Sequence, residues 1–85
     1  MKRQKVFFDT ETTGLDRESD ELLQFSAINE TGKVLLNTYI KPTQHSEWKD
    51  AEAVNHISPD MVLHCRTIDE LLPEIQAIFD NCNEM

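Results

Sequence analysis

Three strand-like segments follow one another in the first half of this chain, with a polar connector at residues 16–21 and a glycine turn at residues 30–33. The segments are residues 6–8, 22–28 and 34–41. Apolar side chains alternate most clearly at Leu23, Phe25 and Ala27, as on a strand with one buried face. A link as short as residues 30–33, which contains a glycine, joins antiparallel neighbours, because a parallel pair needs a crossover of a dozen or more residues. The pattern predicts a three-stranded antiparallel meander.

After Pro42 the spacing of the apolar residues changes from that of strands to that of helices. Ser46 is a candidate N-cap for a short helix over residues 48–55. Ser58 followed by Pro59 favours another helical turn, because serine before the first position and proline at it are a preferred pair. We therefore expect one short helix and a further helical turn after the meander.

The last segment predicts an amphipathic helix. Thr67 and Glu70 have the spacing of a capping box, and Pro73 inside the pattern is expected to bend the helix rather than to begin it. An apolar stripe along one side of this helix needs a sheet to cover. The stripe consists of Ile68, Leu71, Leu72, Ile75, Ile78 and Phe79. The element order β-β-β-α-α predicts an α/β fold in which a further strand would follow the helix.

Two carboxylates, Asp9 and Glu11, follow the first apolar segment directly. We expect a buried strand that ends at these acids. Because side chains alternate along a strand, Phe7, Asp9 and Glu11 should share one face, and Phe8 and Thr10 the other. A carboxylate that risks burial needs compensation, and Mg²⁺ or Mn²⁺ prefers such oxygen ligands. Two such ions roughly 4 Å apart assist phosphoryl transfer, so the pair predicts a metal-dependent phosphodiester site. The alternative is a pair of solvated strand-end charges.

Gly14 and Leu15 close the same segment. Glycine can adopt positive φ, which would let the backbone turn sharply and approach a ligand closely. Leu15 is an apolar residue among polar neighbours, and an exposed leucine there would pack against a base. An ordinary surface turn is the alternative interpretation.

Length and charge limit the classes that remain. At 85 residues the chain forms one domain at most, with a modest core. The net charge of −8 argues against a broad basic surface for nucleic acid, but not against a catalytic site that holds cations. No apolar stretch suits a membrane or a signal peptide, so we expect a cytoplasmic protein with no membrane partner. Cys65 and Cys82 are isolated and are expected to be reduced thiols.

Residues 8–15, Phe-Asp-Thr-Glu-Thr-Thr-Gly-Leu, resemble the first motif of the DEDD superfamily of 3′-to-5′ exonucleases, to which the proofreading subunit of bacterial DNA polymerase III belongs. The later segments resemble that family's next strands and helices in the same order. The likeness implies a ribonuclease H-like fold, of which residues 1–85 would be the N-terminal part of one exonuclease domain. The family's second and third motifs, with two further aspartates and a histidine, would lie beyond residue 85, so later parallel strands are expected to be lacking.

The resemblance implies two-metal hydrolysis, with Mg²⁺ or Mn²⁺, that releases nucleoside monophosphates from the 3′ end of a single strand, DNA being favoured over RNA. Asp9 and Glu11 would be the catalytic residues and the metal ligands. The terminal nucleotide would lie among Thr10, Thr12, Thr13, Gly14 and Leu15. His45, His56 and His64 are interpreted as surface or structural residues, and the family commonly has a turn glycine at the position of His56.

Three hypotheses remain open from the sequence. The first is a part of a DEDD exonuclease that is incomplete and inactive alone. The second is a metal-binding or nucleotide-binding module without turnover, completed by self-association through an unpaired sheet edge. The third is an aspartyl-phosphate phosphatase of the haloacid dehalogenase type, against which Glu11 argues, since that family has aspartate there.

Overall fold

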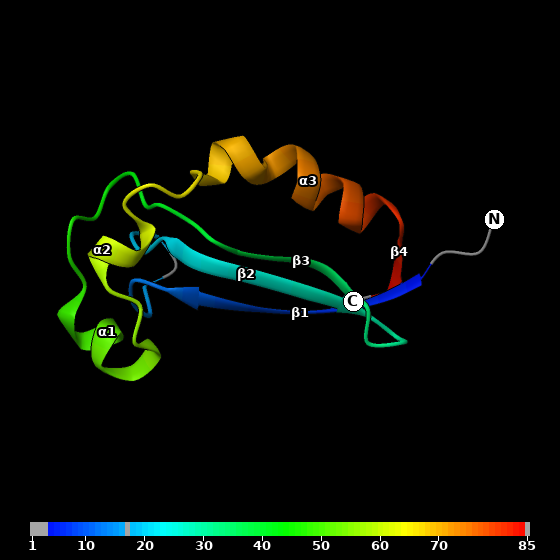
Figure 1. The fold of residues 1–85 in the computed structure, drawn as a ribbon, viewed down its shortest axis with the longest axis horizontal. Helices are drawn as coiled ribbons and strands as arrows, with labels where there is room; N and C mark the ends of the chain where they lie inside the picture. Colours follow the sequence, from blue (N-terminus) through cyan, green and yellow to red (C-terminus); the bar gives the residue numbers. More distant parts are fainter. Residues whose placement is uncertain (1–3, 17, 85) are drawn as a thin grey trace.

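A four-stranded sheet with one helix packed along it forms the body of the molecule (Figure 1). The computed structural model describes residues 4–16 and 18–84. In chain order the elements are β1 (Gln4–Thr12), β2 (Leu22–Asn29), β3 (Val34–Tyr39), α1 (Lys49–Asn55), α2 (Pro59–Val62), α3 (Ile68–Asp80) and β4 (Cys82–Glu84). The sheet order is β3-β2-β1-β4. The short helices α1 and α2 lie at the end of the sheet where β1 finishes (Figure 1).

The antiparallel meander predicted from the short links is confirmed. β1 pairs antiparallel with β2, and β2 pairs antiparallel with β3. The expectation that the first strand runs out at its acids is confirmed to within one residue. β1 includes both carboxylates and ends at Thr12, with Asp9 opposite Ser26 and Glu11 opposite Gln24 in the ladder with β2. Its start lies two residues before Val6.

A short parallel strand completes the sheet within the described residues. β4 pairs in parallel with β1 through Gln4 and Lys5. The strand expected after the last helix is therefore present, which corrects the prediction that later parallel strands are lacking. Beyond these two residues, the outer edge of β1 pairs with no other strand of residues 4–16 and 18–84. Self-association through that edge stays a prediction.

The main core lies between the sheet and α3. Its buried members are Val6, Phe25, Ala27, Ile40, Leu71 and Ile75. The predicted stripe of α3 is confirmed at Leu71 and Ile75, and Ile68, Ile78 and Phe79 pack partly buried against the same cluster. The expectation that Leu72 belongs to the stripe is wrong, since half of its surface is exposed. Because the helix begins at Ile68, Pro73 does not start it.

The aromatic residues of β1 divide between the two faces of the sheet. Phe8 stacks on Phe25 with ring centroids 5.8 Å apart and meets Phe79 edge-on at 5.7 Å, so its side belongs to the α3 face. Phe7 is 58% exposed and lies opposite Ile28 on the other face. The predicted alternation is confirmed, whereas the expectation of a buried strand is wrong for both phenylalanines, since Phe8 is 49% exposed as well.

A second, smaller core fixes α1 and α2 against the end of the sheet. Its buried residues are Leu23, Trp48, Ile57 and Val62. The indole Nε1 of Trp48 donates a hydrogen bond of 2.7 Å to the carbonyl of Ile57. Trp48 itself occupies the N-cap of α1, so the predicted cap at Ser46 is wrong. This tryptophan anchors the start of α1 by burial rather than by a side-chain cap.

The remaining helix boundaries agree with the sequence. Ser58 precedes α2 with Pro59 at its first position, and Thr67 and Glu70 form the capping box that begins α3. His56 ends α1 with a φ of 61°, in the left-handed region that favours glycine. His56 therefore has a structural role in the backbone, because it ends α1 in this conformation. No helix of the described residues is long and apolar enough to cross a membrane.

Candidate nucleotide groove

The two predicted metal ligands lie on the sheet face that α3 does not cover. Asp9 and Glu11 share that face with Ser26 and Gln24, their partners on β2. Asp9 is exposed and its Oδ1 accepts a hydrogen bond of 2.9 Å from the backbone N–H of Thr10, whereas Glu11 is half-buried. The expectation that Asp9 risks burial, and so demands a cation, is therefore wrong. The case for a metal site depends instead on geometry, which presents two carboxylates on one side of a rigid strand.

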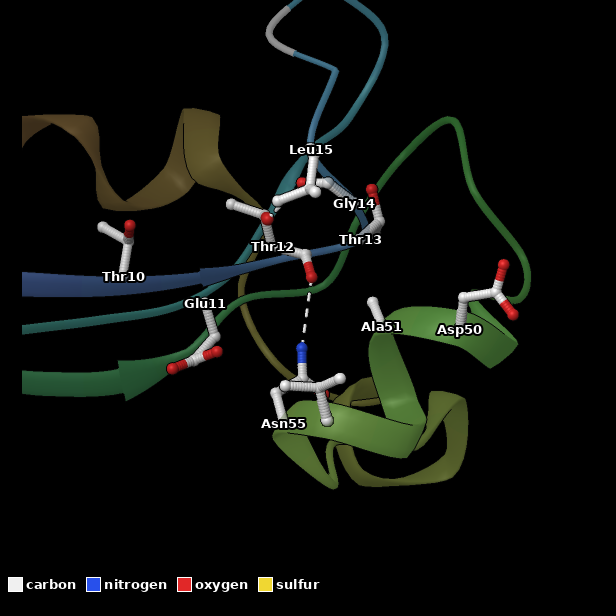
Figure 2. Close-up of a pocket in the computed structure, with 10 residues that line it drawn as sticks. Thr10, Glu11, Thr12, Thr13, Gly14, Leu15, Asp50, Ala51 and Asn55 are labelled. Carbon is white, nitrogen blue, oxygen red and sulfur yellow. Dashed lines mark hydrogen bonds between the residues drawn. The ribbon is translucent and has the colours of Figure 1, made fainter.

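A groove of about 710 Å³ opens beside the end of β1 (Figure 2). Its lining residues are Thr10, Glu11, Thr12, Thr13, Gly14, Leu15, Asp50, Ala51, Val54 and Asn55. The structure thus brings together all five residues that the sequence proposed for nucleotide contacts, and it adds Glu11. Asp9 is not among the lining residues. Residues 10–15 form what we call the first wall of the groove, and the lining residues of α1, from Asp50 to Asn55, form the second. Sequence reasoning did not connect α1 with this site.

Asn55 ties the two walls of the groove together. Its Nδ2 donates to the carbonyl of Thr12 at 3.2 Å (Figure 2). Its Oδ1 accepts from the backbone N–H of Ile57 at 3.0 Å. One amide side chain thereby holds the end of β1 and the chain just after α1. Because both contacts use the amide, only asparagine or a close analogue satisfies them.

The groove combines exposed apolar side chains with hydroxyl groups. Leu15 is fully exposed on the first wall, and Val54 is 80% exposed on the α1 wall. The hydroxyl of Thr12 donates to the carbonyl of Gly14 at 2.6 Å, and Thr13 is only 7% exposed. The predicted contact residues are therefore of two kinds: Leu15 is free to meet a ligand, whereas the Thr12 and Thr13 hydroxyls are already engaged within the protein.

Gly14 is required for a reason that differs from the predicted one. Among the described glycines only Gly32 has a positive φ, so the expected left-handed turn at Gly14 is wrong. A Cβ atom on Gly14 would instead meet the carboxylate of Asp20, with the Asp20 Cγ only 2.8 Å away. Glycine is needed here because a side chain approaches its backbone closely.

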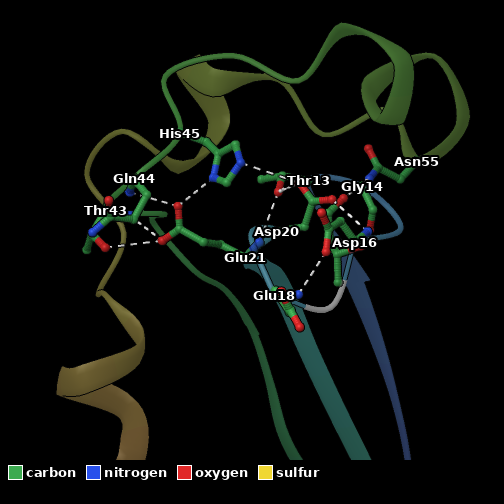
Figure 3. A network of polar contacts seen from close by, with 11 residues as sticks. Thr13, Gly14, Asp16, Glu18, Asp20, Glu21, Thr43, Gln44, His45 and Asn55 are labelled. Carbon is green, nitrogen blue, oxygen red and sulfur yellow. Dashed lines mark hydrogen bonds and ion pairs between the residues drawn. The ribbon is translucent and has the colours of Figure 1, made fainter.

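Asp20 holds the turn of the first wall in place (Figure 3). Its Oδ1 accepts a hydrogen bond of 2.8 Å from the Thr13 hydroxyl, and its Oδ2 accepts one of 2.9 Å from the backbone N–H of Asp16. The Nε2 of His45 lies 3.4 Å from the same Oδ1. These contacts fix the carboxylate that occupies the space beside the glycine.

Glu21, the next residue, binds the segment that leads toward α1 (Figure 3). Its carboxylate accepts hydrogen bonds of 2.7 Å from the backbone N–H groups of Thr43 and Gln44, and one of 3.1 Å from the Thr43 hydroxyl. The Nδ1 of His45 lies 2.7 Å from its Oε1. Desolvation raises the pKa of Glu21, but the bonds from His45, Thr43 and Gln44 together outweigh it and lower the pKa from 4.5 to about 2.

The sequence reasoning missed the part played by Asp20, Glu21 and His45. In the sequence alone, residues 16–21 have the character of a polar connector, and His45 that of an ordinary surface or structural residue. The available signal was an acidic pair directly before an apolar strand, whereas Asp9 and Glu11 come directly after one.

The neighbouring Asp16 has a lowered pKa because the backbone N–H of Glu18 donates to its carboxylate.

Other metal-binding combinations find no support in the described side chains. Among these residues no group of three or more histidine, cysteine, aspartate or glutamate side chains could hold a metal ion. Cys65 is a free thiol, as expected, while the side chain of Cys82 lies outside those that the structure describes. Asp9 and Glu11 place two carboxylates on one face of β1, and carboxylate oxygen is the kind of donor that Mg²⁺ and Mn²⁺ prefer.

An antiparallel meander with a carboxylate pair on β1 and a groove at the strand end characterises this α/β domain. Comparison with known proteins gives the family. The RNase_T family model, described as Exonuclease, matches residues 6–85, and the chain belongs to this exonuclease family. A solved structure of cell-death related nuclease 4 (CRN-4) has a similar fold, with a TM-score of 0.68 and 20% identity over 93% of this chain and 30% of that one.

Sequence relatives point in the same direction. The chain is 30% identical to an uncharacterized exonuclease, CP81, of Escherichia phage 186, over 93% of this chain and 40% of the relative. It is 33% identical to a PolC-type DNA polymerase III of Thermotoga maritima, over 89% of this chain and 6% of the relative. The chain thus spans less than half the length of these relatives. Family membership decides against the aspartyl-phosphate phosphatase hypothesis.

Proposed function

We propose that this chain is the part of a metal-dependent 3′-to-5′ exonuclease that contains strand β1. The exonuclease would remove nucleoside monophosphates from the 3′ end of a single strand, with DNA favoured over RNA as the substrate. The observation that carries the proposal is the groove at the end of β1, which joins Glu11 to the motif residues 12–15 and to α1. Membership of the exonuclease family and the shared face of Asp9 and Glu11 support it.

Asp9 and Glu11 would hold the divalent ions. A bound divalent ion neutralises charge that develops on the phosphodiester and activates water for hydrolysis. The protein's own contribution is to keep both carboxylates on one side of β1, which the ladder with β2 fixes through Ser26 and Gln24. Strand geometry holds these ligands more rigidly than a loop would.

The groove would orient the terminal nucleotide beside these carboxylates. The exposed apolar side chains of Leu15 and Val54, which both line the groove, would offer contacts for a base or sugar. The engaged hydroxyl of Thr12 leaves backbone groups of the turn as the polar contacts for phosphate or the 3′-OH. With two carboxylates as its only assigned ligands, the 85-residue chain alone is proposed to bind metal weakly and to be inactive.

Paramagnetic broadening by Mn²⁺ in amide NMR spectra tests the metal assignment on this chain. Broadening should be strongest at Asp9, Thr10 and Glu11, and should disappear in Asp9→Ala. Asp69→Ala, which removes an exposed acid from the first turn of α3, is the matched control and should leave the pattern unchanged. Broadening centred elsewhere, or unchanged in Asp9→Ala, contradicts the assignment.

A labelled single-stranded oligonucleotide with a free or a blocked 3′ end tests polarity. A longer protein containing this segment should shorten only the free end with Mg²⁺ or Mn²⁺, and Asp9→Ala should abolish that shortening. The isolated chain should leave both substrates intact. Stepwise shortening of the free end by the isolated chain would show that two carboxylates suffice, and shortening of the blocked end would refute the polarity.

A further inference from the structure

Two adjacent carboxylates connect the segments that form the two walls of the groove. Asp20 contacts Thr13 and the backbone of Asp16, which flank the turn of the first wall. Glu21 contacts residues 43–45, which lead toward α1 and the second wall. His45 lies against both acids, 3.4 Å from Asp20 and 2.7 Å from Glu21 (Figure 3).

The contact between Asp20 and Gly14 makes the first wall sensitive to this arrangement. The Asp20 carboxylate occupies the space that a Cβ on Gly14 would fill. If the Asp20 carboxylate moved toward Gly14, it would displace the turn. If the carboxylate moved away, its hydrogen bonds to Thr13 and Asp16 would break. The position of the turn and that of the carboxylate are therefore set together.

The second wall is held with comparable specificity. Four donors converge on Glu21, two of them backbone N–H groups at the start of the segment before α1. Charged hydrogen bonds of this kind are stronger than neutral ones and fix the backbone that supplies them. The side chain of Asn55 adds a direct tie from α1 to the end of β1.

We propose that Asp20 and Glu21, linked through His45, are positioning residues that set the separation of the two groove walls and so the fit of the groove to a terminal nucleotide. The inference rests on the proposed function, since it takes the groove as the nucleotide site. None of these three side chains lines the groove. They act through the turn at Gly14 and through α1.

Titration with thymidine 5′-monophosphate, followed by amide NMR at a temperature where denaturation curves show each variant folded, tests the proposal. Asp20→Ala and Glu21→Ala should each weaken binding about tenfold, the effect of losing a charged hydrogen bond that supports a contact. Glu47→Ala, an exposed acid close to His45 in sequence, should bind like the parent chain. Unchanged binding in both variants, with lower stability alone, would assign these residues a merely structural role.

A double-mutant cycle adds a readout that general destabilisation does not move. Gly14→Ala should weaken binding in the parent chain, because its Cβ collides with the Asp20 carboxylate. In the Asp20→Ala background that space is free, so the same glycine substitution should cost clearly less. Effects on binding that simply add would overturn the linkage between the carboxylate and the turn.

The amide spectra separate this inference from the proposed function. If the parent chain binds no nucleotide, the groove assignment fails, and the same samples still decide the positioning. Asp20→Ala should then shift amides of residues 13–16 and, through His45, those of α1, while α3 stays unchanged. Shifts that stop at residues 13–16 would overturn the proposal that Asp20 connects the two walls.

Discussion

The two ends of β1 are held by different kinds of interaction. Near its start, Val6 is buried and Phe8 stacks on Phe25 under α3, so apolar contacts fix that part of the strand. At its finish, Thr12 and Thr13 are held by polar contacts with Asn55 and Asp20. Close packing of apolar side chains fixes a strand by burying it, so that part of the strand is not open to a ligand. Oriented hydrogen bonds can define the shape of a groove that remains open to solvent. The stable end supports the fold, and the polar end carries the candidate site.

The sharpest way to test this division is to damage the apolar end alone. Leu71→Ala should destabilise the chain by about 3 kcal/mol, because the side chain is fully buried in the α3 core and truncation leaves a cavity. Urea denaturation measures the change. The neighbouring Leu72→Ala, at a half-exposed site, should cost well under half as much. Equal losses in the two variants would contradict the assigned face of α3.

Acid should weaken the polar end, which neutral pH leaves intact. The pKa of Glu21 is lowered from 4.5 to about 2, so its contribution is present above pH 4.5 and is lost as the pH falls toward 2. The lost stability should be at most about 3 kcal/mol, because lowering a pKa by one corresponds to about 1.4 kcal/mol and solvent screens part of the interaction. Urea denaturation at a series of pH values gives the free energy of unfolding. Between pH 6 and pH 2 this free energy should fall less for Glu21→Gln than for the parent chain or for Glu47→Gln. Parallel curves for all three would refute the role of this carboxylate.

Loss of the Asn55 amide should lower the free energy of unfolding by less than the loss of the Leu71 side chain or of the Glu21 charge. Asn55→Ala removes the bonds to Thr12 and Ile57 and should cost about 1 kcal/mol per lost bond at this half-buried site. Asn55→Asp keeps the acceptor for the Ile57 N–H but loses the donor to Thr12. It should therefore retain part of the stability while loosening the groove, which hydrogen exchange at residues 12–15 would detect. An unchanged exchange rate in both variants would argue that α1 is held by its apolar core alone.

The smallest effect on folding is expected at Leu15. Its side chain is fully exposed, so Leu15→Ala should change the free energy of unfolding by no more than about 0.5 kcal/mol. The same change should weaken binding of a single-stranded oligonucleotide, because an apolar contact for the base is lost. Leu63→Ala, an exposed leucine outside the groove, is the control and should leave binding unaltered. Equal binding by both variants would remove Leu15 from the proposed site.

Local patterns predicted the elements better than their limits. The alternation around Phe25 identified β2, and the box at Thr67 identified the start of α3, because both depend on residues close in sequence. The start of β1 was placed two residues late because Gln4 and Lys5 pair with β4, a strand distant in sequence. Leu72 was misassigned because spacing places it at the margin of the helical stripe, and only the position of the sheet decides whether the margin is covered.

The candidate site was predicted on one wall only. Residues 9–15 are contiguous, so their chemistry could be read as one motif and matched to a family. The α1 wall and the carboxylates at Asp20 and Glu21 come from separate segments, and each looks like an ordinary polar stretch in isolation. Their relation to the motif exists only after the chain has folded back on itself.

The sequence by itself determined the meander, the capped helix, the carboxylate pair and membership of an exonuclease family, because periodicity, capping and a contiguous motif are local properties. The tertiary structure alone decided what makes Gly14 necessary, which is the Asp20 carboxylate against its backbone. It also decided that α1 faces the motif and that His45 lies between two acids. These depend on contacts between residues distant in sequence, and such contacts are fixed by the packing of the whole domain rather than by any one segment of it.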